Sequence, residues 1–531
     1  MTEQKKITKA AGIISLGTFL SRIMGFLRDM VLARLFGAGL AADAFFVAFR
    51  IPNMLRELFA EGSMSAAFIP VFTEYLTQKS RRDAWELAGA VFTTLLTILT
   101  AITLLGILFS PWIVKGLAPG FTQYPEKTAL TILLNQIMFP YLLFISLSAL
   151  VMGILNSFRS FAAPALSPVM FNLSIILAAF LLSPLFSKPI LGIALGVLIG
   201  GLSQFLFQLP SLHRLGFSLL FKFNPTHPGV LKIGRLILPT MIGLSVTQIN
   251  ILVNTLLASF LSEGSVTYLF YGMRLIHFPL GLFGVAFATA LLPTMASQAA
   301  AGAINDLKVT LSFGLRLVFF VTLPAMVGLI FLRIPIVHLL FEHGQFTSEA
   351  TLNTATAVLF YSVGLWAFAG VRITIPTFYS LQDTTTPVKV AVLSMIINIL
   401  LNLLLMGPLA HGGLALATSL SAIVHFFILL LLLKRRLGNI ELGRLFTSLL
   451  RNISSCFLIA IICGLVSGLE IWNVQGDWFE KIVLIGMALL FSTAAYLLTQ
   501  RLMGSEEFFF LQDFVSEKFR KKGTSLKNKK L

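Results

Sequence analysis

The sequence predicts an all-α, polytopic membrane protein with fourteen transmembrane helices, and three observations lead to this fold class. Hydrophobic residues make up 57% of the chain and charged residues only 11%, whereas soluble domains carry about 25% charged residues. Apolar runs long enough to cross a bilayer follow one another along most of the chain. Lysine and arginine gather in alternate connections between these runs, as expected for a chain that crosses a membrane repeatedly.

The apolar runs number fourteen, and each has about 20 residues or more, enough to span the hydrocarbon core. The first run carries arginines and has no small-residue cleavage site, so we expect a transmembrane helix there rather than a signal peptide. The second run is interrupted by charges and the tenth contains Arg372 and Pro376, which makes these two the least regular. The runs cover residues 12–36, 42–66, 84–114, 128–155, 161–183, 189–210, 230–260, 266–296, 306–332, 349–378, 387–408, 411–433, 446–468 and 480–502.

The basic residues of the connections predict the orientation. Segments rich in lysine and arginine face the cytoplasm in polytopic proteins, so both termini are expected on that side. The net charge of +17 then reflects a cytoplasmic face rather than binding to nucleic acid. The rich segments hold Lys5, Lys6, Lys9, Lys79, Arg81, Arg82, Arg159, Arg214, Lys222, Lys308, Lys389, Lys434, Arg435, Arg436, Arg444 and the tail from Lys518 to Lys530, and the opposite side holds little beyond Lys115, Lys127, Lys188, Arg333 and Lys481.

The chain also repeats itself at an offset of 221 to 224 residues. The segment FVAFRIPNMLRELF at 46–59 matches FYGMRLIHFPLGLF at 270–283 and aligns Arg50 with Arg274. NSFRSFAAP, which ends at 164, matches YSLQDTTTP, which ends at 387, and GIALG at 192 matches GLALA at 413. Because a unit of six helices ends on the side where it began, we predict two parallel six-helix repeats plus a C-terminal helix pair. Such repeats are typical of secondary transporters, which bind substrate at the repeat interface.

The predicted division of the chain follows from these repeats. An N-terminal six-helix lobe covers 1–225 and a C-terminal six-helix lobe covers 226–440. Two extra helices cover 441–505, and a basic cytoplasmic tail covers 506–531.

The most unusual stretch runs from residue 21 to 75, because it is apolar enough for two membrane helices yet is rich in charge. A charge near the bilayer centre costs about 3 kcal/mol or more, so such residues usually line a water-filled cavity, a partner or a substrate path. Arg34, beside the turn at 37–39, is the one that we expect to reach the headgroups instead. The charged set comprises Arg22, Arg28, Asp29, Arg34, Asp43, Arg50, Arg56 and Glu57.

Helical spacing places part of this set on shared faces. Arg22 and Asp29 lie on one face of the first helix, and Arg50, Asn53 and Glu57 form a stripe on the second, with Arg56 beside it. In the second repeat Arg274 is the clearest intramembrane cation, and His277 follows one turn later. Arginine donates two parallel hydrogen bonds and stays charged, which suits phosphate. The pattern indicates an anionic substrate, unless the acidic residues neutralise the arginines internally.

Catalytic and metal-binding patterns are not evident. Cys456 and Cys463 lie in one apolar run and are interpreted as packing residues, and the histidines are scattered without zinc spacing. We therefore expect no enzyme activity, no resident metal and no cofactor.

Several long motifs resemble those of the MurJ/MviN lipid II flippases, a family of the multidrug/oligosaccharidyl-lipid/polysaccharide exporter superfamily. The longest is SRIMGFLRDMVLARLFGAGLAADAFFVAFRIPNMLRELFAEGSMSAAFIPVF, and the resemblance covers nearly the whole chain. Later matches are MRLIHFPLGLFGVAFATALLPT, LLFEHGQFT, FYSLQDTTTPVKVA and NLLLMGPLAHGGLALATSLSA.

The resemblance implies that the chain moves lipid II, an undecaprenyl diphosphate bearing the peptidoglycan disaccharide-pentapeptide, from the inner to the outer leaflet of the bacterial plasma (inner) membrane by alternating access. The family's fourteen-helix architecture agrees with the helix count, and its final helix pair implies a lateral groove for the lipid tail. Substrate residues implied by the motif are Arg22, Arg28, Arg56 and Arg274, with Ser21, Asp29, Asp43 and Asn53 on motif positions, and Arg50 and His277 are added from their placement.

At two positions this chain departs from the pattern of the family that it resembles. Several relatives carry a glutamate where this chain has His277, so the resemblance does not imply that an acidic residue is required there. Asp383 matches a region implicated in sodium binding in a relative, but Tyr379 stands where a neighbouring ligand is asparagine, so no sodium site is assigned. We expect transport to be coupled to the membrane potential. If a monovalent cation also drives transport, Asp383 is the candidate residue that binds it.

Other readings of the same sequence stay open. An exporter of the same superfamily could carry an O-antigen lipid-linked unit or a drug, although a drug-cation exporter favours carboxylates and aromatics in its cavity. A scaffold for cell-wall synthesis or division proteins, without transport of its own, is the alternative from another class. Such proteins and the membrane lipid are the expected partners besides lipid II.

Overall fold

The computed structural model describes residues 3–216, 223–474, 476–514 and 516. Within these ranges the regular elements are all helices, which confirms the predicted all-helical class. The described chain forms two compact units. Unit 1 comprises Met1–Thr267 with His343–Thr347, and unit 2 comprises Tyr268–Glu342 with Ser348–Leu531. Each unit is described separately below.

Unit 1 begins with the long helix α1, and the apolar runs of the sequence appear as α-helices extended or interrupted by short 3₁₀ or π segments. The elements are α1 (Glu3–Phe36), α2 (Leu40–Arg56), the π-helical η1 (Glu57–Met64), α3 (Ser65–Gln78), α4 (Arg81–Leu108), α5 (Ser110–Leu117), the 3₁₀ helix η2 (Pro119–Gln123), α6 (Pro125–Met138), α7 (Tyr141–Ser157), α8 (Ala162–Leu181), the 3₁₀ helix η3 (Ser183–Leu185), α9 (Ile190–Leu206), α10 (Leu209–Arg214) and α11 (Pro228–Ala258).

Local sequence explains several of these helix ends. Ser80 and Asp83 form a capping box at the start of α4, in which each side chain accepts from the other residue's amide. Pro140 separates α6 from α7, because proline lacks an amide donor and its ring clashes within a helix. After α1 the chain turns at Gly37 with φ of +60°, where a Cβ would lie 2.3 Å from the Gln345 carbonyl oxygen.

The core of unit 1 forms between α3, α4 and α7. Phe68, Phe72, Leu87 and Leu150 are fully buried in it, and Ile233 of α11 joins the same cluster. Helix α11 therefore packs in unit 1, although the sequence division placed residues 226–258 in the second lobe. The compact units change at Thr267 rather than at residue 225, and the division into two six-helix lobes stays a prediction.

Unit 2 contains the second arginine-bearing helix and the C-terminal pair. Its elements are α12 (Ser265–Pro279), the π-helical η4 (Leu280–Gly284), α13 (Val285–Ala300), α14 (Ile304–Phe341), α15 (Ser348–Val363), α16 (Leu365–Ser380), α17 (Thr385–Leu437), α18 (Leu442–Ser467), the 3₁₀ helix η5 (Glu470–Asn473) and α19 (Trp478–Leu502), the first three residues of α12 being assigned to unit 1.

Two helical stretches of unit 2 are broken. The tenth apolar run, predicted as one helix, is the pair α15 and α16 with a bend of 43° between them. Helix α17 has 53 residues, about 80 Å at 1.5 Å per residue, and it turns at Ala410, where φ is 47° and ψ is −130°. A Cβ on Gly413 would lie 2.1 Å from the Leu405 carbonyl oxygen, an approach that a straight helix cannot give to residues eight apart.

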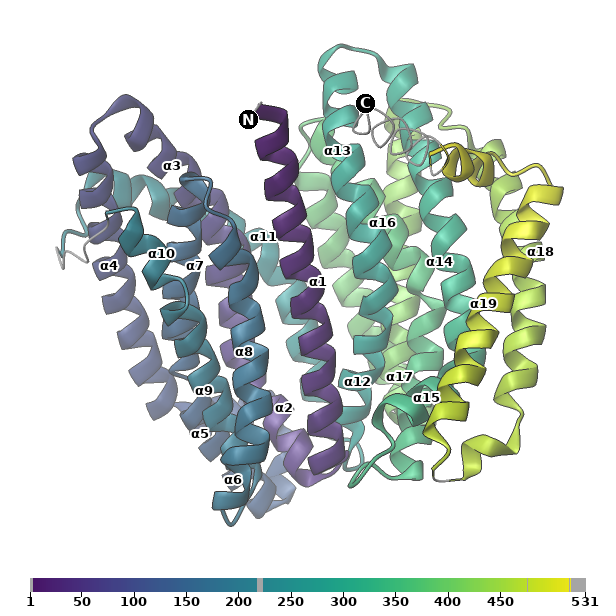
Figure 1. The fold of residues 1–531 in the computed structure, drawn as a ribbon, viewed down its shortest axis with the longest axis horizontal. Helices are drawn as coiled ribbons and strands as arrows, with labels where there is room; N and C mark the ends of the chain where they lie inside the picture. Colours follow the sequence, from purple (N-terminus) through teal and green to yellow (C-terminus); the bar gives the residue numbers. More distant parts are fainter. Residues whose placement is uncertain (1–2, 217–222, 475, 515, 517–531) are drawn as a thin grey trace, which may run out of the picture. The chain divides into compact units, whose positions relative to one another are not determined.

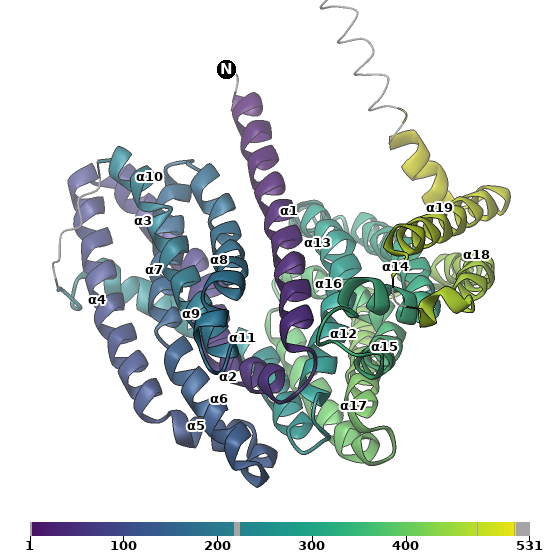
Figure 2. The same ribbon diagram turned by 60° about the horizontal axis from the view of Figure 1, so that its bottom comes forward.

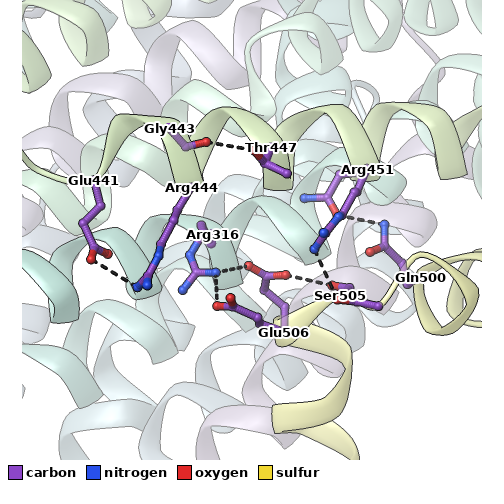
Figure 3. Close-up of polar contacts among 12 residues, drawn as sticks. Arg316, Glu441, Gly443, Arg444, Thr447, Arg451, Gln500, Ser505 and Glu506 are labelled. Carbon is purple, nitrogen blue, oxygen red and sulfur yellow. Dashed lines mark hydrogen bonds and ion pairs between the residues drawn. The ribbon is translucent and has the colours of Figure 1, made fainter.

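The C-terminal helices α18 and α19 run side by side, and α18 packs along α14 (Figures 1 and 2). Buried polar groups connect the three helices. The hydroxyl oxygen of Tyr496 lies 2.8 Å from the Phe320 carbonyl oxygen and 3.0 Å from Asn452 Oδ1, so its one proton is shared between these two acceptors. After α19 the chain turns back, and Arg316 of α14 pairs with Glu506 at 2.6 Å and with the buried Glu507 at 3.0 Å (Figure 3). These contacts fix the pair to unit 2.

Nine described helices are long and apolar enough to cross a membrane, or up to eleven when each of two bent pairs is taken as one span. The chain is therefore a multi-pass membrane protein. Most of the predicted basic tail lies outside the described residues, and its described part, 506–514, is helical.

Candidate functional site

Helix α1 brings four predicted site residues to unit 1. Arg28 donates from Nε and Nη2 to Asp29 Oδ1 at 3.0 Å and 2.6 Å, and Asp29 is fully buried. Arg22, two turns earlier, is exposed, and no described acidic side chain pairs with it. The carbonyl of Ser21 accepts from Asn172 Nδ2 at 3.4 Å. Arg28 is therefore neutralised by Asp29, whereas Arg22 has no described acidic partner.

The end of α2 carries a second polar network. Arg56 Nε donates to Asn53 Oδ1 at 3.1 Å, and Asn53 Nδ2 donates to Glu57 Oε1 at 3.0 Å. Glu57 also accepts from Gln248 of α11, so the network joins α2 to a helix far away in the sequence. Arg50, on the same stripe of α2, is half-buried. The predicted stripe is therefore present, and Glu57 partly neutralises Arg56, at 3.5 Å.

Asp43 has a different environment from the arginines. Its carboxylate accepts from Lys127 Nζ at 2.8 Å, from the Gly264 amide at 2.8 Å, and from the amide and hydroxyl of Thr267 at 3.0 Å and 2.7 Å. The side chain is almost completely buried. Asp43 therefore compensates a buried lysine and caps the start of α12, where a carboxylate interacts favourably with the exposed amides. In this conformation its carboxylate serves the fold, and its substrate role stays a prediction.

The cap at α12 has a counterpart at α2. Glu263, just before α12, accepts from the amide of Leu40, the first residue of α2, at 2.6 Å. Asp43 of α2 therefore caps the start of α12, and Glu263, just before α12, caps the start of α2.

Arg274 and His277 lie on α12 in unit 2. Arg274 is half-buried and His277 is exposed. Arg22, Arg28 and Arg56 belong to unit 1 and Arg274 to unit 2, so the single arginine cavity stays a prediction.

Asp383 lies between α16 and α17. Its carboxylate accepts from the Thr386 amide at 3.0 Å and the Thr386 hydroxyl at 2.8 Å, and Arg436 Nη1 lies 2.6 Å from Oδ2. The Thr386 amide most of all, with the threonine hydroxyls and Arg436, holds the pKa of Asp383 below its ordinary value against the opposing effect of burial. The described residues contain no cluster of three or more His, Cys, Asp or Glu side chains that could hold a metal ion.

Sequence reasoning missed three buried basic residues, which are Lys127, Arg316 and Lys481. Lys127 and Lys481 were assigned to the connections, yet each is at most 4% exposed. Lys481 Nζ lies 2.9 Å from His338 Nε2, and His338 Nδ1 lies 2.9 Å from Glu342. Burial raises the pKa of Glu342, but hydrogen bonds, first that from His338, outweigh it and lower the pKa to about 2.

Only the two acceptors near Lys481 left a signal in the sequence. His338 and Glu342 are four residues apart and so share a helix face. The partners of Lys127 and Arg316 are 84 and 190 residues away, and no local pattern identifies them.

The family model described as lipid II flippase MurJ matches residues 32–487. The probable lipid II flippase MurJ of Vibrio cholerae is 41% identical over 442 residues, which is 81% of this chain and 83% of the relative. The probable lipid II flippase MurJ of Buchnera aphidicola from Acyrthosiphon pisum is 36% identical over 492 residues, which is 92% of this chain and 96% of the relative.

Solved structures agree with the sequence matches. Lipid II flippase MurJ in an inward closed conformation matches with a TM-score of 0.76 and 28% identity, covering 94% of this chain and 99% of that one. An inward-facing multidrug resistance transporter of the MATE family and MOP superfamily matches with a TM-score of 0.66 and 14% identity, covering 81% and 99%, which shows the fold alone. Since the family model spans most of the chain and relatives above 30% identity match over most of their length, this chain belongs to the MurJ lipid II flippase family.

Proposed function

We propose that this protein is a lipid II flippase of the bacterial inner membrane, serving peptidoglycan biosynthesis. The names of its relatives support the substrate. The observation that carries the proposal within this chain is Arg22, an exposed guanidinium on a membrane helix without a described acidic partner. Such a cation is costly in hydrocarbon and is suited to a phosphate group that enters the membrane with its substrate.

The mechanism that we propose is alternating access. The arginines Arg22, Arg28, Arg56 and Arg274 bind the diphosphate from the cytoplasmic side, and the two lobes then expose it to the outer side. In the present conformation, hydrogen bonds join the starts of α2 and α12. We propose that the starts of α2 and α12 separate during the cycle, when hydrogen bonds to water replace these contacts.

We propose fourteen spans with both termini in the cytoplasm. The eleven apolar spans become twelve if α17 counts as two helices joined at Ala410, since its length of about 80 Å exceeds a bilayer of about 30 Å. Helix α1 and the α2–η1–α3 stretch add two more, because their charges lower the hydropathy without shortening the helices.

Two features support the parallel repeats. The π-helical segments η1 and η4 begin at Glu57 and Leu280, 223 residues apart, close to the offset of the sequence repeat. The caps that join α2 to α12 connect Leu40 with Glu263 and Asp43 with Thr267, at separations of 223 and 224. Contacts between equivalent positions are what a pseudo-two-fold axis produces.

Cysteine labelling tests the orientation. In a variant whose buried Cys456 and Cys463 are replaced by alanine, cysteines at the exposed positions Ser80 and Asn439 are expected to react only with reagent that reaches the cytoplasm. Cysteines at Ser262 and Glu470 should react with impermeant reagent added outside. An exchange between the two pairs would contradict the topology.

Complementation tests the function. Expression of this chain in a bacterium depleted of its own lipid II flippase is expected to restore growth and cell shape, whereas an Arg22→Ala/Arg274→Ala variant made at the same level should not. Absence of rescue by the well-expressed native chain would overturn the proposal. It would favour an exporter of another substrate or a non-transporting scaffold.

We propose that the membrane potential, negative inside, drives the cycle. A unit charge that crosses 100 mV changes its free energy by about 2.3 kcal/mol, so an anionic substrate leaves the cytoplasm favourably and the empty cationic cavity returns inward. Translocation in vesicles is expected to slow when the potential is collapsed while the pH gradient is held. An unchanged rate would instead indicate passive or proton-coupled exchange.

A further inference from the structure

Residues 506–514 form a short helix after α19, which we call the tail helix. The chain turns into it at Gly504, where φ is +64°, and the Arg451 side chain of α18 donates to the Gly504 carbonyl at 3.2 Å. Figure 1 shows the tail helix lying across the end of α19, turned sideways from the direction of α14 and α19. Because it does not continue the span, its depth in the membrane decides what its side chains contact.

Two buried clusters of charge mark that depth along α14. At one end of the helix, His338 Nε2 lies 2.9 Å from Lys481 Nζ of α19. At the other end, Arg316 pairs at 2.6 Å and 3.0 Å with Glu506 and Glu507, the first two residues of the tail helix (Figure 3). Arg316 and His338 are 22 residues apart, or about 33 Å along a helix, close to the hydrocarbon thickness of about 30 Å. The tail helix therefore begins at the boundary between hydrocarbon and headgroups.

One face of the tail helix is apolar beyond the ion pair. The i, i+3, i+4, i+7 spacing of a single helix face is followed by Glu507, Phe510, Leu511 and Phe514. The face starts on α14, since Glu507 is buried and the ring of Phe510 packs edge-on against Phe313 of α14, with centroids 4.8 Å apart. It then extends past the protein, because Phe510 is still 45% exposed and Phe514 is 58% exposed.

The opposite side of the tail helix is mostly polar. It holds four exposed residues, Glu506, Phe509, Gln512 and Asp513. A two-faced helix at the membrane surface lies in the interfacial plane, with its apolar face against the acyl chains. The sequence that follows, residues 517–531, has seven lysines and arginines and one glutamate, and basic clusters next to a membrane helix attract anionic lipid.

We propose that the tail helix lies flat at the membrane surface, with Phe510 and Phe514 among the acyl chains, and that the basic residues after it bind anionic phospholipid. The helix thereby holds the end of the C-terminal helix pair at one leaflet, which is the cytoplasmic leaflet in the proposed topology. This lipid contact does not depend on the transported substrate, so its test is independent of the proposed function.

Spin labels on single cysteines test the depth, in the full chain without its native cysteines in lipid nanodiscs. Accessibility to oxygen, which concentrates among acyl chains, is compared with accessibility to a water-soluble nickel complex. The label in Phe514→Cys is expected to give a ratio close to that in Leu490→Cys, at a position of α19 that is 65% exposed. The label in Gln512→Cys should give a ratio close to that in Ser80→Cys, at the exposed start of α4.

Two results would overturn the proposed position of the tail helix. The nickel complex could reach positions 512 and 514 equally, which would place the helix in water. Both reagents could instead be excluded from position 514, which would mean that protein, such as a second copy of the chain, covers Phe514. Thermal unfolding of each labelled variant at the temperature of the unlabelled chain shows that the fold is kept.

Lipid selectivity tests the basic residues. Spin-labelled phosphatidylglycerol, which is anionic, and spin-labelled phosphatidylcholine are the two probes, and the native chain is expected to immobilise a larger fraction of phosphatidylglycerol. Arg520→Gln/Lys521→Gln/Lys522→Gln should lose part of this selectivity, because each basic residue near the surface adds to the attraction. The matched control, Arg520→Lys/Lys521→Arg/Lys522→Arg, keeps the charge and should keep the selectivity. Unchanged selectivity in the glutamine variant would overturn the assignment of anionic lipid.

Discussion

Arg22→Ala is expected to reduce lipid II translocation roughly tenfold to a hundredfold while leaving the folded protein at its normal level. Each hydrogen bond between charged groups contributes about 1.5–3 kcal/mol, and Arg22 has no described acidic partner whose burial would be disturbed. Translocation is measured in cells or proteoliposomes, with thermal unfolding followed on the same samples. Arg22→Lys should recover only part of the rate, because an ammonium group lacks the planar fork.

The same loss of transport is expected at Arg28, Arg56 and Arg274, but the structure separates Arg28 from Arg22. Arg28→Ala leaves Asp29 fully buried without its cation, so this variant should also be less stable. Arg28→Ala/Asp29→Asn restores the charge balance and should regain stability without regaining transport. Full translocation by all four alanine variants would show that these arginines do not bind the substrate.

Asp43→Ala is expected to destabilise the protein by about 3–5 kcal/mol, because it leaves Lys127 as an uncompensated buried charge. The lysine is 4% exposed and its Nζ lies 2.8 Å from Asp43. Lys127→Met should cost a similar amount. The double variant Asp43→Ala/Lys127→Met should cost much less than the sum, since contacting residues are not additive. A residual loss of about 1 kcal/mol is expected from the missing cap at α12.

Thermal unfolding in detergent measures these differences. The matched control is Lys188→Met, which removes a lysine whose pair with Glu126 at 3.0 Å is largely exposed, and exposed pairs contribute at most about 1 kcal/mol. If Asp43→Ala unfolds at the same temperature as Lys188→Met, the buried pair does not hold α2, α6 and α12 together. Cysteine labelling at position 262 in the Asp43→Ala variant would then show whether the segment just before α12 becomes more accessible when Asp43 is removed.

The sequence by itself determined that the chain is helical, membrane-embedded and a member of its family. Run length and residue composition are properties of consecutive residues, so they predicted helices at each of the fourteen runs. The predicted alignment of Arg50 with Arg274 likewise needed only the spacing along the chain, and the repeat that it implies stays a prediction. The arginine stripe near Asn53 was predictable because residues three and four apart share a helix face, and the structure shows this stripe bonded through Glu57.

Tertiary structure alone decided which charges are compensated and where helices break. Asp43, predicted as a substrate residue from its motif, is engaged by Lys127 and by the start of α12, 84 and 224 residues away. Lys481, predicted in a connection, is buried against His338, 143 residues away. The turn at Ala410 depends on the close approach of Leu405 to Gly413. The energy of a buried charge is set by neighbours in space, and the order of residues along the chain does not specify those neighbours.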